Sequence, residues 1–291
     1  MKFQIAARQP FNFVSVVQSH GWFQLQPFHY DESSRVFSTP LGLSGGRVID
    51  LHLSGLETGL QVETDPLDTT EKNEVIITLR WMFSLDEDLL SFYEAIQGEP
   101  ALAHVKARSM GRILRSATLF EDVIRTILTT NTLWAATKRM TANLVDQFGQ
   151  PWPGDGSRKA FPTPDRLAKA SEAQLRSETR LGYRAPYVLN LARSLVSGQL
   201  DLESLKTISL PTVELRKELL RLQGVGPYAA ANLLMLLGRF DFVPVDSWAF
   251  KMVSHEWYDD QPVTTAQVEA VFEKWGEWKG LVYFCWDWSL Q

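Results

Sequence analysis

The sequence predicts an α+β fold in which an antiparallel β-sheet domain precedes a mostly α-helical core. Residues 1–85 alternate apolar and polar positions in short runs, whereas the chain from Leu85 onward has helical spacing. A chain of 291 residues that is 45% hydrophobic can bury a large core and holds about two domains. We therefore expect an accessory domain over 1–100 that contains the sheet, and a helical core over 101–291.

The first 85 residues contain short apolar runs between turn signals. The runs are Val14–Val17, Val48–Leu53 and Val75–Leu79, and the turns are at Gly45-Gly46 and Asp65-Pro66. We interpret this pattern as a small antiparallel sheet packed by helices.

The rest of the chain has helical spacing broken by one loop. Asp86 and Asp88 mark a helix start before Leu89, and helical spacing extends over 120–148. The segment 149–164 is rich in Gly and Pro and is predicted to be a loop. Further helices are expected near 164–170, 172–177, 187–197, 212–222, 227–237, 247–258 and 265–275.

Several classes of protein are excluded by composition. A single cysteine, Cys285, cannot form an intramolecular disulfide or a four-cysteine zinc or iron–sulfur site. The N-terminus has no continuous apolar segment of a secretory signal, and no apolar run approaches the roughly 20 residues that span a bilayer. We expect an intracellular protein that acts as a monomer without a membrane, in the cytoplasm and nucleoid of a bacterium or the nucleus of a eukaryote.

Charge is unevenly distributed along the chain. The net charge is −5 overall, but residues 103–200 carry 15 Lys and Arg against 7 Asp and Glu. Residues 1–102 carry 6 against 14, and residues 201–291 carry 8 against 13. A basic middle between acidic flanks fits local contact with phosphates. A helical segment with a solvated basic face is an equally good interpretation of charge alone.

The most informative stretch is 222–246, LQGVGPYAAANLLMLLGRFDFVPVD. A Gly224-Val225-Gly226 turn lies between two helical segments, and glycine at both turn positions permits φ > 0 and close approach of a partner. Pro227 suits the first helical position, and the amides at that helix start form a site for phosphate. Asp246 follows about 20 residues after the second glycine.

This arrangement resembles the helix–hairpin–helix (HhH-GPD) DNA glycosylase superfamily, in which a hairpin precedes an essential aspartate. Residues 120–149 resemble its first core helices, and Phe161–Pro164 and Leu181–Ala185 (LGYRA) resemble the 8-oxoguanine glycosylase branch. Residues 1–100 resemble the accessory domain shared with 3-methyladenine DNA glycosylase II. The resemblance spans nearly the whole chain and is most specific over 181–246.

The resemblance implies that Asp246 is catalytic. A carboxylate stabilises the oxocarbenium-like sugar of N-glycosidic hydrolysis and orients the attacking water. Its place before an apolar helix also predicts an N-cap, which is the commoner role of such an aspartate. Bifunctional members place a lysine two residues after the second hairpin glycine, and Tyr228 stands there instead, so the chain should leave an abasic site without cleaving the strand.

Three residues are implied to fill the gap left by a flipped-out base in damaged double-stranded DNA. Tyr183 supplies an aromatic wedge, Arg184 supplies a hydrogen-bonding fork, and Asn131 occupies the position that enters the vacated space. On residue type alone, capping a helix junction is the more ordinary role for Tyr183, and ending a helix is the more ordinary role for Asn131.

The hairpin is expected to bind a DNA phosphate through the amides around Gly224, Val225, Gly226 and Tyr228. Family members often hold a monovalent cation, Na⁺ or K⁺, on hairpin carbonyls. The matching main-chain carbonyls here are those of Leu220, Leu222 and Val225. No cofactor is otherwise required.

Aromatic residues are concentrated at the C-terminal end, where six of the ten tryptophans lie in 248–291. Aromatic faces attract cations, and N-alkylated purines are cationic bases, so an alkylated base is the expected substrate. Packing in the core is the ordinary role of any single ring. The order of the family places four residues nearest to the base: Trp248, Tyr283, Asp287 and Asn232, the last of which fits helix packing equally well.

Three functions remain open at this stage. The first is a monofunctional DNA glycosylase of base excision repair, similar to 3-methyladenine DNA glycosylase II. The second is an 8-oxoguanine-type DNA glycosylase/AP lyase, although His20–Leu25 does not match that branch's pocket residues. The third is a non-enzymatic module that binds damaged DNA.

Overall fold

The computed structural model describes residues 1–288, which group into two compact units by their contacts. Unit 1 comprises Met1–Glu87 and Arg112–Thr207, and unit 2 comprises Asp88–Gly111 and Ile208–Gln291. The α+β prediction is confirmed, since a five-stranded sheet and many helices are present. The domain boundary at residue 100 stays a prediction. Each of the two units combines segments from different parts of the chain, and residue 100 lies within a segment of unit 2.

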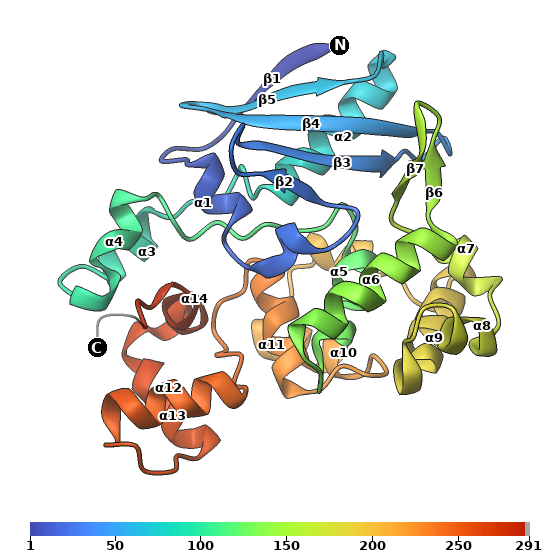
Figure 1. Cartoon of the computed structure of the whole chain (residues 1–291). Helices are drawn as coiled ribbons and strands as arrows, with labels where there is room; N and C mark the ends of the chain where they lie inside the picture. The colour runs from blue at the N-terminus through green and yellow to red at the C-terminus, as the bar shows by residue number, and fades with distance from the viewer. Residues whose placement is uncertain (289–291) are drawn as a thin grey trace. The chain divides into compact units, whose positions relative to one another are not determined.

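Unit 1 is built on an antiparallel sheet with the strand order β1-β5-β4-β3-β2 (Figure 1). Alternate side chains of these strands face the core, among them Leu51 and Leu53 of the central strand, which are fully buried. The strands are β1 (Lys2–Ala6), β2 (His29–Asp31), β3 (Val36–Gly42), β4 (Val48–Leu56) and β5 (Gly59–Thr64).

Two apolar runs that suggested strands are helical in the structure. Val14–Val17 lies in α1 (Phe13–Val17), where the Asn12 side chain accepts a hydrogen bond from the Ser15 amide. Val75–Leu79 lies in α2 (Thr69–Met82), which begins with a capping box between Asp68 and Glu71. The strand interpretation was wrong because these caps favour helices, and a four-residue spacing of apolar positions places them on one helix face.

The segment 149–164, predicted to be a loop, contains the hairpin β6 (Gln150–Trp152) and β7 (Asp155–Ala160). Trp152 Nε1 donates to Asp65 at 2.8 Å, and the Arg158 guanidinium pairs with the buried Asp50 carboxylate. These contacts attach the hairpin to the main sheet (Figure 1). Sequence reasoning missed it because the partners lie about 90 to 110 residues away in the chain.

The remaining elements of unit 1 are helical, and several short ones begin at Pro or Ser positions typical of helix starts. The predicted stretch 120–148 is two helices separated by a turn at 130–133. Besides α1 and α2, the helical elements of unit 1 are η1 (Gly21–Gln24), α5 (Leu119–Thr129), α6 (Trp134–Phe148), α7 (Pro164–Ala168), α8 (Glu172–Ser177), η3 (Gly182–Arg184), α9 (Ala185–Val196) and η4 (Glu203–Lys206).

Unit 2 is helical within the described residues and has an aromatic core. The rings of Phe272, Trp275 and Trp286 contact one another with centroids about 6 Å apart, and all three are buried. Its elements are α3 (Leu90–Ala95), η2 (Pro100–Leu102), α4 (Ala103–Ala107), α10 (Thr212–Leu220), α11 (Pro227–Leu236), α12 (Ser247–Trp257), α13 (Thr265–Phe272), η5 (Glu273–Trp278) and α14 (Lys279–Cys285). Among residues 1–288, no helix is both long and apolar enough to cross a membrane.

Candidate active site and nucleic-acid interface

Asp246 is the N-cap of α12, as predicted. Its backbone is extended, and Oδ1 accepts a hydrogen bond from the Ala249 amide at 2.9 Å. The side chain is half-buried, so one side of the carboxylate is held by the helix while it keeps access to solvent. The positive end of the helix dipole at this position favours a negative charge.

Two tyrosines lie close to Asp246. Burial raises the pKa of Tyr283 far above its usual range, and the charges of Asp246 and Tyr228 and a side-chain hydrogen bond with Asp246 raise it further. Tyr283 therefore remains a phenol that donates to the Asp246 carboxylate. Its ring packs against Phe272 with the centroids 5.5 Å apart, which fixes its direction. The structure thus brings together Asp246, Tyr228 and Tyr283, which lie on three different helices or caps.

The two helices of 212–236 and the hairpin turn between them are present as predicted. α10 and α11 pack against each other, and the turn between them is closed by a hydrogen bond from the Val225 amide to the Leu222 carbonyl at 3.0 Å. Pro227 is at the first turn of α11, and the N-cap Gly226 provides no side chain to bond the first-turn amides. The start of α11 is therefore suited to an anion.

The two turn glycines serve different purposes, because only one of them uses the positive φ that glycine permits. Gly224 has φ +88°, in the left-handed region that favours glycine. Gly226 has φ −94°, which any residue can adopt, and a Cβ there would meet no atom within 4 Å. Neither backbone conformation nor internal packing requires glycine at 226, so the open space is available to a partner.

The carbonyls of Leu220, Leu222 and Val225 lie at the end of α10 and in the turn. Leu220 is the last residue of α10, where helix carbonyls lack an intrahelical partner. The Leu222 carbonyl accepts one hydrogen bond and retains a second lone pair. Neutral carbonyl oxygens of this kind are ligands for Na⁺ or K⁺, so the residues present fit a monovalent cation.

The other residues assigned to the base pocket differ in their surroundings. Trp248 is half-exposed in the first turn of α12, with the Lys251 ammonium 5.9 Å from its ring centroid. The Asn232 side chain donates to the Tyr228 carbonyl at 3.0 Å, which is a contact within α11. The Asp287 amide donates to the Ala101 carbonyl at 3.1 Å.

In unit 1, Asn131 lies in the exposed turn between α5 and α6 with φ +47°. Asparagine tolerates this left-handed conformation better than most residues. The guanidinium of Arg184 donates to the carbonyl of Thr130 and, at 3.3 Å, to that of Asn131. The turn that presents Asn131 is therefore fixed by a residue 53 positions further along the chain.

Arg184 itself is only 6% exposed, which corrects its predicted role. The sequence interpretation gave its guanidinium to an orphaned base, whereas in the structure the side chain is enclosed and its Nη2 donates to two backbone carbonyls. Its guanidinium carbon also lies 4.4 Å from the Tyr183 ring centroid. Arg184 therefore positions the Asn131 turn and the Tyr183 ring.

Tyr183 is 46% exposed, which is unusual for an aromatic ring of this size and suits a wedge. It lies in η3 between Gly182, with φ +58°, and the buried Arg184, and its ring meets Tyr187 edge to face. An exposed ring with fixed neighbours can insert between bases without reorganising the loop that carries it.

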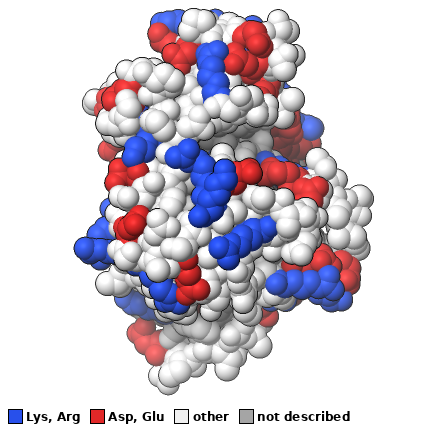
Figure 2. Space-filling view, turned by 90° about the vertical axis from the view of Figure 1, so that its right-hand side faces the viewer, with Lys and Arg blue, Asp and Glu red and all other residues white. Residues whose placement is uncertain are grey.

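Much of the positive charge of 103–200 is neutralised within the chain. Arg115, Arg125, Arg158, Lys159 and Arg176 all form ion pairs with carboxylates. Figure 2 shows basic and acidic side chains interspersed on one face. Part of the positive charge of residues 103–200 is therefore used in ion pairs within the protein.

Two cationic side chains of residues 103–200 remain available for contact with DNA. Lys138 and Arg139 are exposed on α6, just after the Asn131 turn, and neither forms an ion pair in the described part of the chain. They are the cations of this turn best placed for phosphate contact.

Two features of the site were missed by sequence reasoning. The contact of Tyr283 with Asp246 and the tie from Arg184 to the Asn131 turn join residues that are distant in sequence. No local spacing signals such pairs. The charge spacing of Glu121 and Arg125, at i and i+4 of a helix, would have predicted their ion pair.

Residues 124–277 match the profile of the HhH-GPD superfamily of base excision DNA repair proteins. The chain belongs to this superfamily. The match includes the Asn131 turn, η3, the α10–α11 hairpin and Asp246. The protein is therefore a DNA glycosylase of base excision repair, and the predicted family is confirmed.

Relatives within the HhH-GPD superfamily fall in two branches. The DNA-3-methyladenine glycosylase of Bacillus subtilis is 24% identical over 229 residues, covering 76% of this chain and 74% of its own. The solved 3-methyladenine DNA glycosylase of Archaeoglobus fulgidus has a TM-score of 0.78 at 22% identity, covering 97% and 96% of the two chains.

The second branch is equally similar in fold. The 8-oxoguanine glycosylase/lyase of Clostridium acetobutylicum, solved with double-stranded DNA that contains cytosine opposite 8-oxoguanine, has a TM-score of 0.72 at 21% identity. It covers 98% of this chain and 96% of its own. That relative was solved bound to DNA, and fold similarity alone does not distinguish the two branches.

Proposed function

We propose that this protein is a monofunctional DNA glycosylase that flips an alkylated base out of the duplex and hydrolyses its N-glycosidic bond, leaving an abasic site. The observation that carries the proposal is the pairing of a helix-capping Asp246 with Tyr228 at the position where a lyase has lysine.

Asp246 stabilises the positive charge that develops on the sugar as the base departs. Because Ala249 holds Oδ1 and Tyr283 donates to the same carboxylate, the group is oriented before the substrate arrives. Access to solvent at this half-buried position admits the water that attacks the sugar. Asp246 orients that water, and hydrolysis yields the free base and the abasic sugar.

Tyr228 determines the reaction type. Strand cleavage by a lyase begins when an amine attacks the sugar and forms an imine, which a phenol cannot do. Tyr228 also contributes to the electrostatic surroundings of Tyr283, so it belongs to the same cluster as the catalytic carboxylate. The enzyme should therefore release the base with water only.

DNA is held by two sets of groups. The start of α11 receives a phosphate at the open space beside Gly226, and Lys138 and Arg139 add cationic contacts. Tyr183 wedges into the stack, and Asn131 enters the space left by the flipped base. A Na⁺ or K⁺ on the carbonyls of the α10–α11 turn would stiffen the phosphate site.

The substrate class follows from Trp248. Its exposed ring lies two residues after Asp246, and it already attracts the Lys251 ammonium. A ring of this kind stabilises a positively charged alkylated purine better than a neutral base. The B. subtilis and A. fulgidus relatives, both named as 3-methyladenine glycosylases, agree with this choice.

The test is a panel of duplexes that carry 3-methyladenine-type lesions, hypoxanthine, uracil or 8-oxoguanine, each analysed with and without alkali. Strand cleavage only after alkali, on alkylated duplexes, is the expected result. Cleavage without alkali, together with a borohydride-trapped protein–DNA adduct, would instead establish a glycosylase/lyase. Tight binding to abasic DNA with no base release from any duplex would establish a non-enzymatic damage binder.

A further inference from the structure

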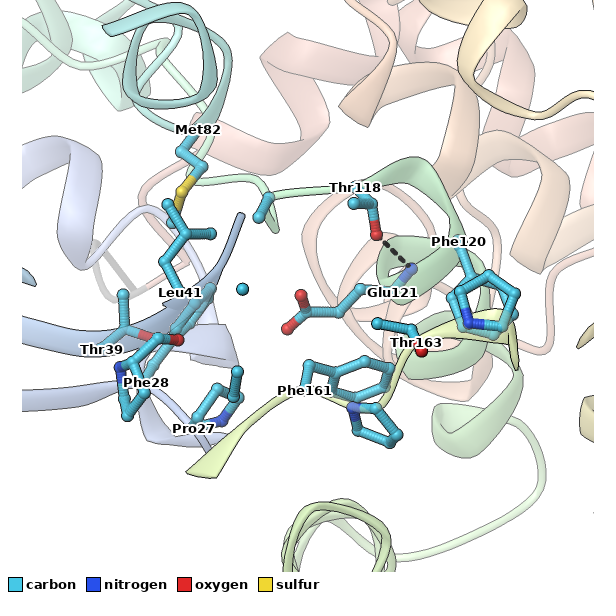
Figure 3. A pocket seen from close by; sticks show the side chains of 16 residues that line it. Pro27, Phe28, Thr39, Leu41, Met82, Thr118, Phe120, Glu121, Phe161 and Thr163 are labelled. Carbon is cyan, nitrogen blue, oxygen red and sulfur yellow. Dashed lines mark hydrogen bonds between the residues drawn. The ribbon is translucent and has the colours of Figure 1, made fainter. Parts of the chain in front are cut away.

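Unit 1 contains a cavity of about 100 Å³ that is remote in sequence from the hairpin and Asp246. It lies between the end of β3, the start of α5 and the segment 161–164 that follows β7 (Figure 3). Leu41, Met82, Phe28 and Phe161 are among the apolar side chains that line it. Gly42, Thr118 and Thr163 are exposed and form its mouth.

One carboxylate points into this cavity. Figure 3 shows the Glu121 side chain projecting from α5 into the space between Leu41 and Phe161. Glu121 is only 4% exposed, and its Oε1 accepts from Arg125 Nε at 3.0 Å and also from Arg125 Nη2. Within the described residues, Oε2 bonds to no protein group, and it is not among the enclosed polar atoms, so it faces the open space of the cavity.

A buried carboxylate with an unpartnered oxygen is unfavourable. Desolvation raises the pKa of Glu121 from its usual value, and the charge of Arg125 counters that effect only in part. Polar groups inside proteins are almost always hydrogen-bonded to protein or to water, so we expect Oε2 to bond to whatever group occupies the cavity. The partner must be a hydrogen-bond donor, because an ionised carboxylate can only accept.

The walls indicate what kind of donor fits. The Arg125 guanidinium carbon already lies 4.2 Å from the Phe28 ring centroid and 5.8 Å from that of Phe161. These rings thus accept planar cations. A second planar cation on Oε2 would complete a cation–carboxylate–cation arrangement, which occurs in buried Arg–Glu–Arg triads. The volume suits a few heavy atoms, since a cavity of roughly 150 Å³ can hold benzene.

We propose that this cavity is a binding site for a small planar cation of the amidinium or guanidinium class, which donates to Oε2 of Glu121 and lies between the aromatic walls. The site is independent of the proposed glycosylase reaction. It uses none of the residues assigned to base excision or DNA contact.

The test compares three ligands of the same size and shape: acetamidinium, acetamide and acetate. Binding is measured without DNA, by NMR titration of the methyl signals of Leu41 and Met82, with the Met140 methyl as an internal control outside the cavity. Acetamidinium should produce saturable shifts with a dissociation constant on the order of 1 mM. Acetamide should bind about tenfold more weakly, and acetate should not bind.

A cavity-filling variant separates this site from binding elsewhere. Ala117 and Ala7 are both partly buried against the same hydrophobic core, but only Ala117 lines the cavity. Ala117→Leu should abolish the acetamidinium shifts, whereas Ala7→Leu should leave them unchanged. Glu121→Gln should also weaken binding, but it leaves the buried Arg125 unpaired and can unfold the protein, so Ala117→Leu decides.

Three outcomes would overturn the proposal. The first is the absence of saturable shifts with acetamidinium, which would mean that the cavity holds only water. The second is equal binding of acetate, which would show that Glu121 does not select the ligand. The third is unchanged binding to Ala117→Leu.

Discussion

Asp246 and Asp122 both stand at the start of a helix, yet their surroundings differ. Asp246 caps α12, is half-buried, and has partners in Ala249 and Tyr283. Asp122 lies in the first turn of α5 and is fully buried. Its Oδ1 accepts from the Ser116 amide at 2.8 Å, whereas its Oδ2 has no partner within the described residues.

The difference shows how burial decides what a carboxylate can do. Desolvation, countered only in part by hydrogen bonds from Ser116, raises the pKa of Asp122 to about 7. A carboxyl that is enclosed in this way can influence stability but cannot reach a substrate. Asp246 has polar partners and access to solvent, which are the conditions for stabilising charge on a bound sugar.

The largest effect is expected for Asp246→Asn, which removes the negative charge but retains the N-cap. Base release from alkylated duplex should fall at least about a thousandfold, since charge stabilisation of the transition state is lost. Single-turnover kinetics would measure the rate, and DNA affinity should be unchanged. Asp241→Asn, in the same segment, is the control. Retained turnover of Asp246→Asn would contradict the catalytic assignment.

Asp122→Asn tests the buried member of the comparison. The folded protein has a pKa of about 7 for this group against 3.8 as the ordinary value, so between these pH values it holds a proton that the unfolded chain releases. The free energy of unfolding therefore falls as pH rises through this window, and asparagine removes the fall. The variant should be more stable than the wild type by about 4 kcal/mol at pH 8, and by about 2 kcal/mol at pH 5.

Urea unfolding at the two pH values would measure this difference. Exposed Asp165→Asn is the matched control and should follow the pH dependence of the wild type. Equal stability of the wild type and Asp122→Asn at pH 8 would show that Asp122 is not strained by burial.

Tyr283→Phe tests the hydrogen bond to Asp246, because it removes only the phenolic hydroxyl that donates to the carboxylate. The rate of base release should fall about tenfold, as expected for one hydrogen bond to a charged group, with little change in KM. Tyr30→Phe is the control. A large rise in KM with an unchanged kcat would instead assign Tyr283 to base binding.

A third helix start, that of α11, has no capping side chain. Gly226→Ser should supply one, and because φ there is −94° the free energy of unfolding should change by only a few tenths of a kcal/mol. The added side chain would occupy the open space beside the turn, so affinity for duplex DNA should fall severalfold in fluorescence anisotropy. Unchanged affinity would place the phosphate elsewhere.

The sequence allowed accurate prediction where the signal was local. The α10–α11 turn, with Pro227 after its second glycine, and the N-cap role of Asp246 follow from spacing over a few residues. The same local reasoning failed at Val75–Leu79, where the capping box at Asp68 overrode an apparent strand pattern. At Gly226 the sequence could not show which property of glycine is used, since its φ is ordinary and only the open space beside it distinguishes it.

Contacts between distant segments could not be predicted. The β6–β7 hairpin depends on Asp50 and Asp65, and the cavity beside Glu121 is lined by five separate parts of the chain. Neither leaves a periodic pattern. Burial is likewise a tertiary property, so the sequence identified Arg184 by type but could not show that it was enclosed.

The enclosed Arg184 has a consequence for the rate at which damage is found. By holding the carbonyls of Thr130 and Asn131 together with the Tyr183 ring, it removes conformational entropy from the wedge while the protein folds. That entropy is then not lost again at each encounter with DNA. In the proposed function, a stiff Tyr183 wedge would test each base pair by the ease with which it opens, and it would pass quickly over pairs that resist.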